Sequence, residues 1–265
     1  MNSMKNMKLG DVELEYVLSA NENKDTILFV HGLGANLSQF ENQHGFFKKK
    51  FQVLTVNLRG HGESTSLPDQ GKSPFKLSDF AKDLILLLDE LNIPKVHFVG
   101  NSMGGNVGYE FLQNNPERLL SLVTFGTTAK IKKSKLTVFI LKLVYRLMNQ
   151  KILAKLSAAA GVKNSSKEKI KEMMQKVNKK TILQLLILLA NFNYLPVITT
   201  AEIPAMIIKG GKDKEINNVL ESTLKSWQNH DIFEVIEIKN AGHFANLDNP
   251  EEFNKVLEQF VEKID

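Results

Sequence analysis

A serine stands between glycines in the stretch V-G-N-S-M-G-G, residues 99–105. Ser102 forms the pattern G-x-S-x-G with Gly100 and Gly104, directly after strand-forming residues and directly before a helical pattern. In that context a serine sits on a sharp strand-to-helix turn that exposes its hydroxyl. Glycine also serves ordinary tight turns, so the motif alone is compatible with a solvated serine. A nucleophilic serine would need a base, a group that orients the base, and donors for an oxyanion.

The six histidines are the candidates for the base, because an imidazole titrates near neutral pH and can accept and return a proton. His243 follows the last predicted strand and precedes the last helix, which places it at the same sheet edge as Ser102. We expect the others in structural positions: beneath a loop for His31, in a stabilising loop for His61, inside a strand for His97, and at the surface for His44 and His230.

The acid that orients the base should also follow a strand. Asp213 does so in A-M-I-I-K-G-G-K-D, whereas Asp231 opens a strand and Asp248 lies close to the cap of the last helix. Ser102, Asp213 and His243 then occur in the order Ser, Asp, His, which is expected of one fold in particular. We therefore predict these three residues as a catalytic triad.

Backbone donors for the oxyanion are predicted at two strand-to-loop junctions. The Met103 N–H follows the serine at a helix N-terminus, where amide groups are unpaired and the helix dipole favours negative charge. The loop H-G-L-G, residues 31–34, could aim the Leu33 N–H at the same point. Losing one such donor typically costs ~10²–10³-fold in rate. The alternative for this loop is an ordinary turn.

Short runs rich in β-branched residues predict buried strands. Helical patterns separate them, which implies a mainly parallel sheet covered on both faces. The predicted strands are 12–18, 26–30, 52–56, 96–99, 120–125, 205–208 and 233–238. For the last helix, Asn249 is the expected N-cap, Pro250 the first helical residue, and Glu252 the partner in a capping box.

One stretch breaks the alternation of strands and helices. From about Thr128 to Thr200 the sequence shows helical patterns and no strand, at roughly 131–149, 151–160, 166–178 and 181–193. We interpret residues 128–200 as a helical cap, or lid, inserted in a core made of residues 1–127 and 201–265.

Composition narrows the classes of protein further. The chain contains no cysteine, which excludes disulfides, thiolate metal sites and cysteine nucleophiles. Its start, M-N-S-M-K-N-M-K-L-G, lacks the apolar region of a secretory signal. The longest apolar run, 182–190, is too short to span a bilayer. We therefore expect a soluble, cytoplasmic protein.

The positive charge of the chain lies in the predicted cap. The whole chain carries +5, but residues 129–200 hold fifteen basic and two acidic residues, a net charge of +13. Lys135, Lys142, Arg146 and Asn149 share one face of a largely apolar helix. Such a helix can make peripheral contact with an anionic membrane. The alternative is a lid helix with its apolar face over the active site. Nucleic acid is not expected, because no binding motif is present.

The motifs together resemble the α/β-hydrolase superfamily over nearly the whole chain. H-G-L-G, L-R-G-H-G-E-S, G-N-S-M-G-G, G-K-D and A-G-H-F-A-N-L-D-N-P-E-E-F follow the order and approximate spacing of that family. The resemblance implies an α/β fold with an eight-stranded, mostly parallel sheet flanked by helices, and a helical cap after the sixth strand. It implies no cofactor and no metal. It also implies an acyl-enzyme on Ser102, hydrolysed by water that His243 activates.

The leading interpretation is a serine hydrolase, esterase- or lipase-like, whose partner is a small hydrophobic carboxylic ester. Ser102 argues against the haloalkane dehalogenase and epoxide hydrolase branches, which carry an aspartate there. The serine motif is also similar to that of C–C bond hydrolases of ring-cleavage products, which commonly have Trp where this chain has Phe244. Enol-lactonases and monoacylglycerol lipase-like enzymes resemble the chain as well. A slow or non-catalytic ligand-binding signalling protein on the same fold is the remaining alternative.

Overall fold

The computed structural model describes residues 3–21, 24–65 and 76–264. The predicted core segment 1–127 therefore includes residues 1–2, 22–23 and 66–75, which lie outside this description. Within the described ranges, an eight-stranded sheet has the order β1-β2-β4-β3-β5-β6-β9-β10. These strands are β1 Lys5–Leu9, β2 Val12–Leu18, β3 Thr26–Val30, β4 Gln52–Val56, β5 Val96–Asn101, β6 Leu119–Phe125, β9 Ala205–Gly210 and β10 Phe233–Ile238.

The sheet is mostly parallel, as the sequence predicts. β2 pairs antiparallel with β1 and with β4, and the remaining neighbours pair in parallel. Strands β3 and β4 are buried along their whole length, because both faces of the sheet are covered. The sequence patterns do not include β1: its residues K-N-M-K-L are largely exposed at the sheet edge, so no apolar alternation marks it.

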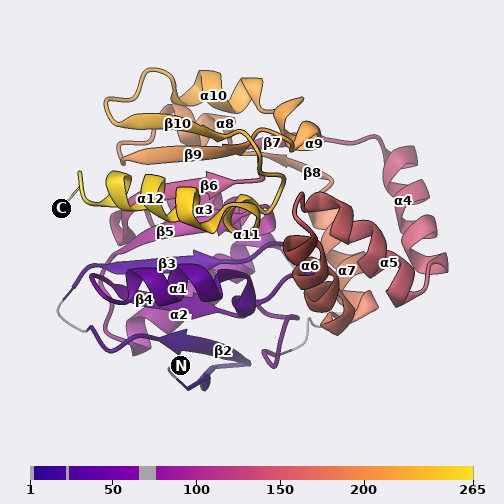
Figure 1. Cartoon of the computed structure of the whole chain (residues 1–265), viewed down its shortest axis with the longest axis horizontal. Coiled ribbons are helices and arrows are strands. Elements are labelled where there is room, and N and C mark those ends of the chain that lie inside the picture. Colours follow the sequence, from indigo (N-terminus) through magenta and orange to yellow (C-terminus); the bar gives the residue numbers. More distant parts are fainter. Residues whose placement is uncertain (1–2, 22–23, 66–75, 265) are drawn as a thin grey trace.

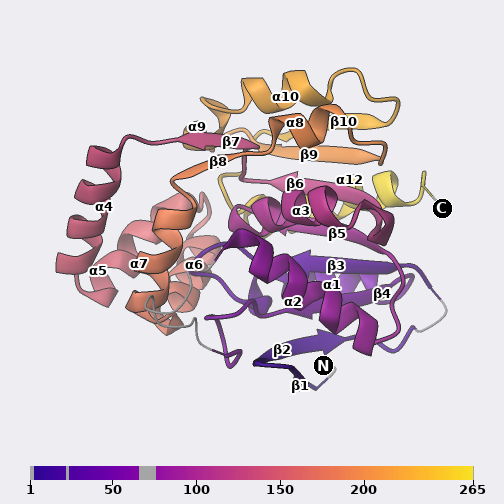
Figure 2. The ribbon, with the colours of Figure 1, turned by 180° about the vertical axis from the view of Figure 1, so that it is seen from behind.

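Helices cover both faces of the sheet (Figures 1 and 2). α1 and α12 pack on one face through phenylalanines that join Phe29 and Phe125 of the sheet. α2, α3, α8 and α10 lie on the other face, where Trp227 is buried. The helices are α1 Glu41–Phe47, α2 Leu77–Glu90, α3 Met103–Asn114, α4 Lys135–Leu147, α5 Gln150–Ser157, α6 Asn164–Lys176, α7 Lys179–Leu188, α8 Leu195–Thr199, α9 Lys214–Asn217, α10 Glu221–Trp227, α11 Ala245–Asp248 and α12 Pro250–Val261.

The N-terminus of α12 differs from the expected capping box. Pro250 is at the first helical position, as predicted. The Asn249 side chain makes no cap hydrogen bond, and its amide instead donates to the Glu252 carboxylate at 2.6 Å. The Asn249 backbone N–H already donates to the carbonyl of Ala245, the first residue of α11, and so closes that helix. The preceding helix therefore uses the donor that a capping box needs.

The segment between β6 and β9 contains helices α4 to α7, which lie together beyond one end of the sheet (Figures 1 and 2). The expectation of no strand there is wrong. β7 Lys130–Lys132 and β8 Asn191–Asn193 pair antiparallel and join the two ends of the segment. Both strands alternate polar and apolar residues over three positions, too few to stand out from the helical patterns. Tertiary pairing decides their conformation.

The division of the chain into core and cap stays a prediction.

Among the described residues, no helix is both long and apolar enough to cross a membrane.

Candidate active site

Ser102 lies on a strained turn between β5 and α3. Its φ is +53°, which is uncommon for a residue other than glycine. Its N–H donates to the Phe125 carbonyl at 2.9 Å, and its carbonyl accepts from Gly105 and Asn106 at the start of α3. A Cβ on Gly104 would lie 2.2 Å from the Val30 carbonyl oxygen. Glycine thus lets the turn pack directly against β3, and neighbouring strands hold the serine in place.

The loop that carries Leu33 runs beside the serine. A Cβ on Gly32 would lie 3.1 Å from the Ser102 Cβ, so only a very small residue fits between the two segments. Leu33 and Ser102 line the same cavity. Met103 follows the serine as the first residue of α3. Both predicted donor residues therefore adjoin the serine, one in sequence and one in space.

His31 and His61 hold this loop from below, in the structural positions expected for them. The His31 ring accepts from the Leu58 N–H at 3.0 Å and lies 2.8 Å from the Gly32 carbonyl. The His61 ring accepts from the Gly34 N–H at 3.3 Å. Burial lowers the pKa of His61 to about 4 and that of His31 well below its ordinary value. Both rings are therefore neutral at pH 7 and act as hydrogen-bond partners.

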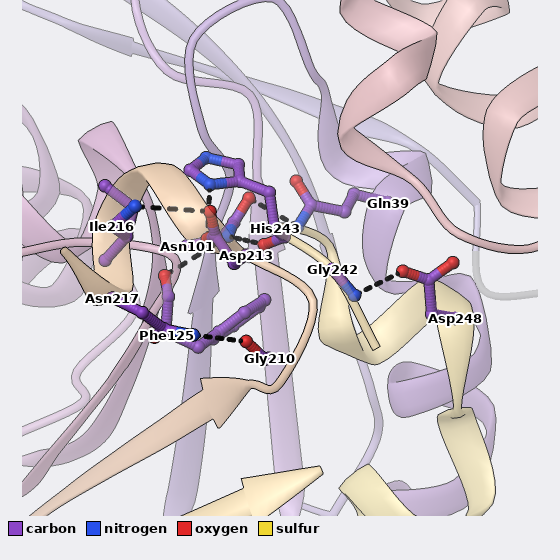
Figure 3. Close-up of polar contacts among 10 residues, drawn as sticks. All are labelled: Gln39, Asn101, Phe125, Gly210, Asp213, Ile216, Asn217, Gly242, His243 and Asp248. Carbon is purple, nitrogen blue, oxygen red and sulfur yellow. Dashed lines mark hydrogen bonds and ion pairs between the residues drawn. The ribbon is translucent and has the colours of Figure 1, made fainter. Parts of the chain in front are cut away.

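His243 is hydrogen-bonded to Asp213 (Figure 3). The distance from the His243 Nδ1 to the Asp213 Oδ2 is 2.8 Å, and the carboxylate is buried. The other carboxylate oxygen accepts from the Ile216 N–H at 3.4 Å, so Asp213 also caps α9. With Nδ1 donating to the carboxylate, Nε2 is the ring atom that is left to accept a proton.

The two alternative acids lie elsewhere. Asp248 is fully buried and accepts three backbone N–H groups, from Gly242 at 2.8 Å, Val162 at 2.8 Å and Lys163 at 3.0 Å. It therefore binds the loop before His243 to the segment after α5, and Figure 3 shows its contact with Gly242. Asp231 lies in the turn before β10 and lines a separate cavity.

Asn101 is a site residue that the sequence reasoning missed. Its side-chain amide donates to the His243 carbonyl at 3.0 Å and to the Phe125 carbonyl at 3.2 Å (Figure 3). Its oxygen accepts from the Gln39 amide at 3.1 Å. Gln39 continues the buried chain of amides through Asn246. The variable position of G-x-S-x-G thus ties the serine turn to the histidine loop.

Gly126, directly after β6, is a second position that the sequence reasoning missed. Its φ is +61°, and a Cβ there would lie 2.7 Å from the His243 carbonyl oxygen and 3.2 Å from its ring Cε1. The end of β6 therefore needs glycine to pass the histidine. Gly126 is followed by Thr127 and Thr128, a polar stretch without a carboxylate, so the sequence gave no signal for this role.

The remaining histidines lie outside the site. His97 is buried in β5, as expected, with its Nδ1 2.8 Å from the Ser121 Oγ, and burial lowers its pKa to about 4. His44, expected at the surface, is partly exposed, but both of its ring nitrogens are buried and burial lowers its pKa. His230 is partly exposed and packs its ring on Trp227.

A cavity of about 270 Å³ lies over Ser102 and His243. Its wall combines the loops at the sheet edge with side chains from α4 to α7. The apolar lining residues are Leu33, Ile131, Tyr145, Ile170, Met173, Met174, Ile182, Leu189, Phe192, Ile216 and Phe244. Lys133 and Glu215 bring charge to the same wall. The site thus places a hydroxyl and an imidazole–carboxylate pair beneath an apolar chamber.

Comparisons with known proteins agree with this architecture. The model of the family described as alpha/beta hydrolase fold matches residues 25–250. A curated 3-oxoadipate enol-lactonase of Acinetobacter baylyi is 26% identical over 260 residues, which cover 96% of this chain and 94% of that protein. The solved enol-lactonase from Burkholderia xenovorans LB400 has a TM-score of 0.84 at 22% identity and covers 97% of this chain and 100% of its own. A thermophilic esterase from Thermogutta terrifontis has a TM-score of 0.85 at 20% identity and covers 99% of both. At these identities the solved structures show a shared fold.

Proposed function

The chain belongs to the alpha/beta hydrolase fold family, and on that premise we propose that it is a serine hydrolase of carboxylic esters with hydrophobic acyl groups. The observation that carries the proposal is the 2.8 Å hydrogen bond between His243 and Asp213, with His243 and Ser102 lining one cavity. Nucleophile, base and orienting acid are the parts that acyl transfer to a serine requires.

In this mechanism the Ser102 oxygen attacks the ester carbonyl while the His243 Nε2 takes the hydroxyl proton. Asp213 stabilises the imidazolium that forms. The backbone N–H groups of Leu33 and Met103 bind the oxyanion of the tetrahedral intermediate. The intermediate collapses to an acyl-enzyme, and His243 returns the proton to the departing alcohol. Water then attacks the acyl group, again losing its proton to His243, and releases the acid and free Ser102.

The lining of the cavity supports a hydrophobic acyl group. Met173, Ile182 and Phe244 are among the side chains that would surround it. A long, flexible acyl chain gains about 0.8 kcal/mol for each CH₂ that it buries. The acyl group would therefore provide most of the binding free energy.

A lactone is the second candidate substrate. It is a cyclic ester, so the same steps open its ring, and the leaving alcohol stays attached to the acyl chain. Two relatives that match nearly the whole chain are named as enol-lactonases. Lys133 on the cavity wall would pair with a carboxylate on such a substrate.

The test is hydrolysis of p-nitrophenyl esters across acyl lengths and of simple lactones, with wild type beside Ser102→Ala. We expect wild type to hydrolyse one class and the variant to lose at least ~10³-fold in kcat. A serine-directed phosphonate should label wild type and leave the variant unlabelled. Absence of both hydrolysis and label would contradict the proposal and favour a ligand-binding role. Label without ester hydrolysis would favour the cleavage of C–C bonds.

A further inference from the structure

Helix α4 exposes a stripe of apolar side chains to solvent. None of its residues is buried, and the helix lies at the far end of the molecule from α12 (Figures 1 and 2). The stripe consists of Leu136, Phe139, Ile140, Leu143 and Leu147, which are 67%, 64%, 50%, 47% and 76% exposed. Their spacings of three, one, three and four residues place them on one face. Contiguous apolar surface of this kind marks an interaction site.

The stripe points away from the cavity. The partly buried residues of α4 and its C-cap are Val138, Leu141, Tyr145 and Met148, at spacings that define the opposite side of the helix. Tyr145 is the residue of α4 that lines the cavity over Ser102. A lid helix with its whole apolar face over the site would bury the stripe, so this arrangement favours an external partner.

One edge of the stripe is basic. On the helix, Lys135, Lys142 and Arg146 lie together beside Phe139, since they are separated by seven and four residues. In the part of the chain that the structure describes, none of the three forms an ion pair with a carboxylate. The sequence has no acidic residue from 129 to 167. The charge of this surface is therefore of one sign.

A groove links this surface to the site. It has a volume of about 530 Å³ and is lined by Val144 and Met148 from the α4 region and by Leu156 of α5. Asp213 and His243 line it as well. The groove thus runs from the exposed helix to the imidazole, with apolar side chains on the helical side and the charged residues Lys212, Lys214 and Glu215 on the other.

We propose that α4 docks on an anionic lipid bilayer. The apolar stripe enters the boundary of the acyl chains, and the basic edge faces the phosphates of the headgroups, the arrangement that amphipathic interfacial helices adopt. A second copy of the chain fits less well, because a two-fold interface uses the same surface of both copies and would gather two basic edges at one contact, in a segment without acidic residues from 129 to 167. The docking of α4 on a bilayer does not depend on the proposed function. The entry of a lipid-soluble ester through the groove does rest on the proposed function.

The test is co-sedimentation of the full chain, carrying Ser102→Ala, with phosphatidylcholine vesicles that contain or lack phosphatidylglycerol. Because this variant has no nucleophile, its binding is read independently of catalysis. We expect binding to the anionic vesicles. The combined change Phe139→Gln, Leu143→Gln and Leu147→Gln should weaken it by more than about tenfold. Lys135→Gln, Lys142→Gln and Arg146→Gln together should weaken it by about a hundredfold, at roughly fivefold for each charge.

The matched controls use the same changes elsewhere. Lys167→Gln, Lys171→Gln and Lys176→Gln remove three charges from α6, and Leu86→Gln and Ile232→Gln remove two exposed apolar side chains outside α4. These controls should bind as the parent does. Equal loss from the α6 control, or no binding to anionic vesicles, would overturn the proposal. So would a dimer in solution that the α4 apolar variant turns into a monomer.

Discussion

Two aspartates near His243 have different tasks. Asp213 contacts the imidazole directly, whereas Asp248 reaches only backbone N–H groups, those of Gly242, Val162 and Lys163. The first carboxylate faces the ring where charge would develop during the reaction. The second satisfies donors that would otherwise be buried without a partner.

We therefore predict opposite outcomes for two isosteric changes. Asp213→Asn should lower kcat by ~10⁴-fold, because the imidazolium loses its counter-charge and its orientation, while the unfolding free energy changes little. Asp248→Asn should lower the unfolding free energy by about 1.5–3 kcal/mol, because its amide cannot accept all three hydrogen bonds. Ester hydrolysis and urea unfolding of both variants check this. Similar losses of kcat in the two variants would contradict the division of roles.

The sequence marks the predicted catalytic residues more clearly than it marks the residues that support them. Ser102, Asp213 and His243 each follow a strand, so spacing along the chain places them at one sheet edge. Asn101 and Asp248 support them through contacts with segments about 140 and 85 residues away. No local pattern marks such contacts, because they depend on how loops meet after folding.

At the scale of elements, the end of β6 meets the loop of His243 at Gly126. Gly126 has a positive φ directly after β6. A Cβ on this residue would lie too close to the carbonyl oxygen and the imidazole ring of His243. Alanine at this position therefore meets two obstacles, a strained backbone and a displaced histidine.

Gly126→Ala should lower kcat by more than about tenfold and lower the unfolding free energy by about 1–3 kcal/mol. Gly45→Ala is the matched control. Its added Cβ meets nothing within 4 Å in α1, and alanine favours helices over glycine. Kinetics with a p-nitrophenyl ester and urea unfolding compare the two variants. Full activity in Gly126→Ala would show that the histidine loop tolerates the shift.

The strands that sequence patterns missed share a physical reason. β1, β7 and β8 are short or edge strands with exposed polar residues, and partners elsewhere in the chain decide their pairing. β3, β4, β5, β6 and β9 are buried along nearly their whole length, because both of their faces are covered, and apolar runs therefore mark them in the sequence. Periodicity detects burial, and it does not detect pairing.

Across the whole molecule, histidines whose pKa is lowered by burial make stability depend on pH, with larger shifts at His31, His61 and His97 than at His44. His31, His61 and His97 have pKa values lowered by burial, to about 4 for the latter two. In the unfolded chain the same groups titrate near 6.5. As pH falls through 6.5, these imidazoles bind protons in the unfolded state but stay neutral in the folded state. Their contribution to stability is therefore complete above pH 6.5 and is lost toward pH 4.

We expect the unfolding free energy to fall by roughly 3–5 kcal/mol between pH 6.5 and 5, at up to about 1.4 kcal/mol per histidine and pH unit. Urea unfolding at a series of pH values measures this. His97→Gln should remove roughly a quarter to a third of the dependence, because one of the three most strongly shifted groups no longer titrates. A flat profile in wild type would show that these rings are protonated in the fold.

The segment after α5 is attached to the loop that carries His243, and this attachment limits which helices can be exchanged with those of a relative. The Ala160 carbonyl accepts from the His243 N–H at 3.1 Å, and Asp248 binds the next turn of the same segment. Residues 160–163 are thus bound to the loop that carries His243, although they lie between helices α5 and α6. A chimaera could take α4 and α5 from a relative and acquire a new substrate range. A graft that replaced 160–163 would have to bring its own histidine loop.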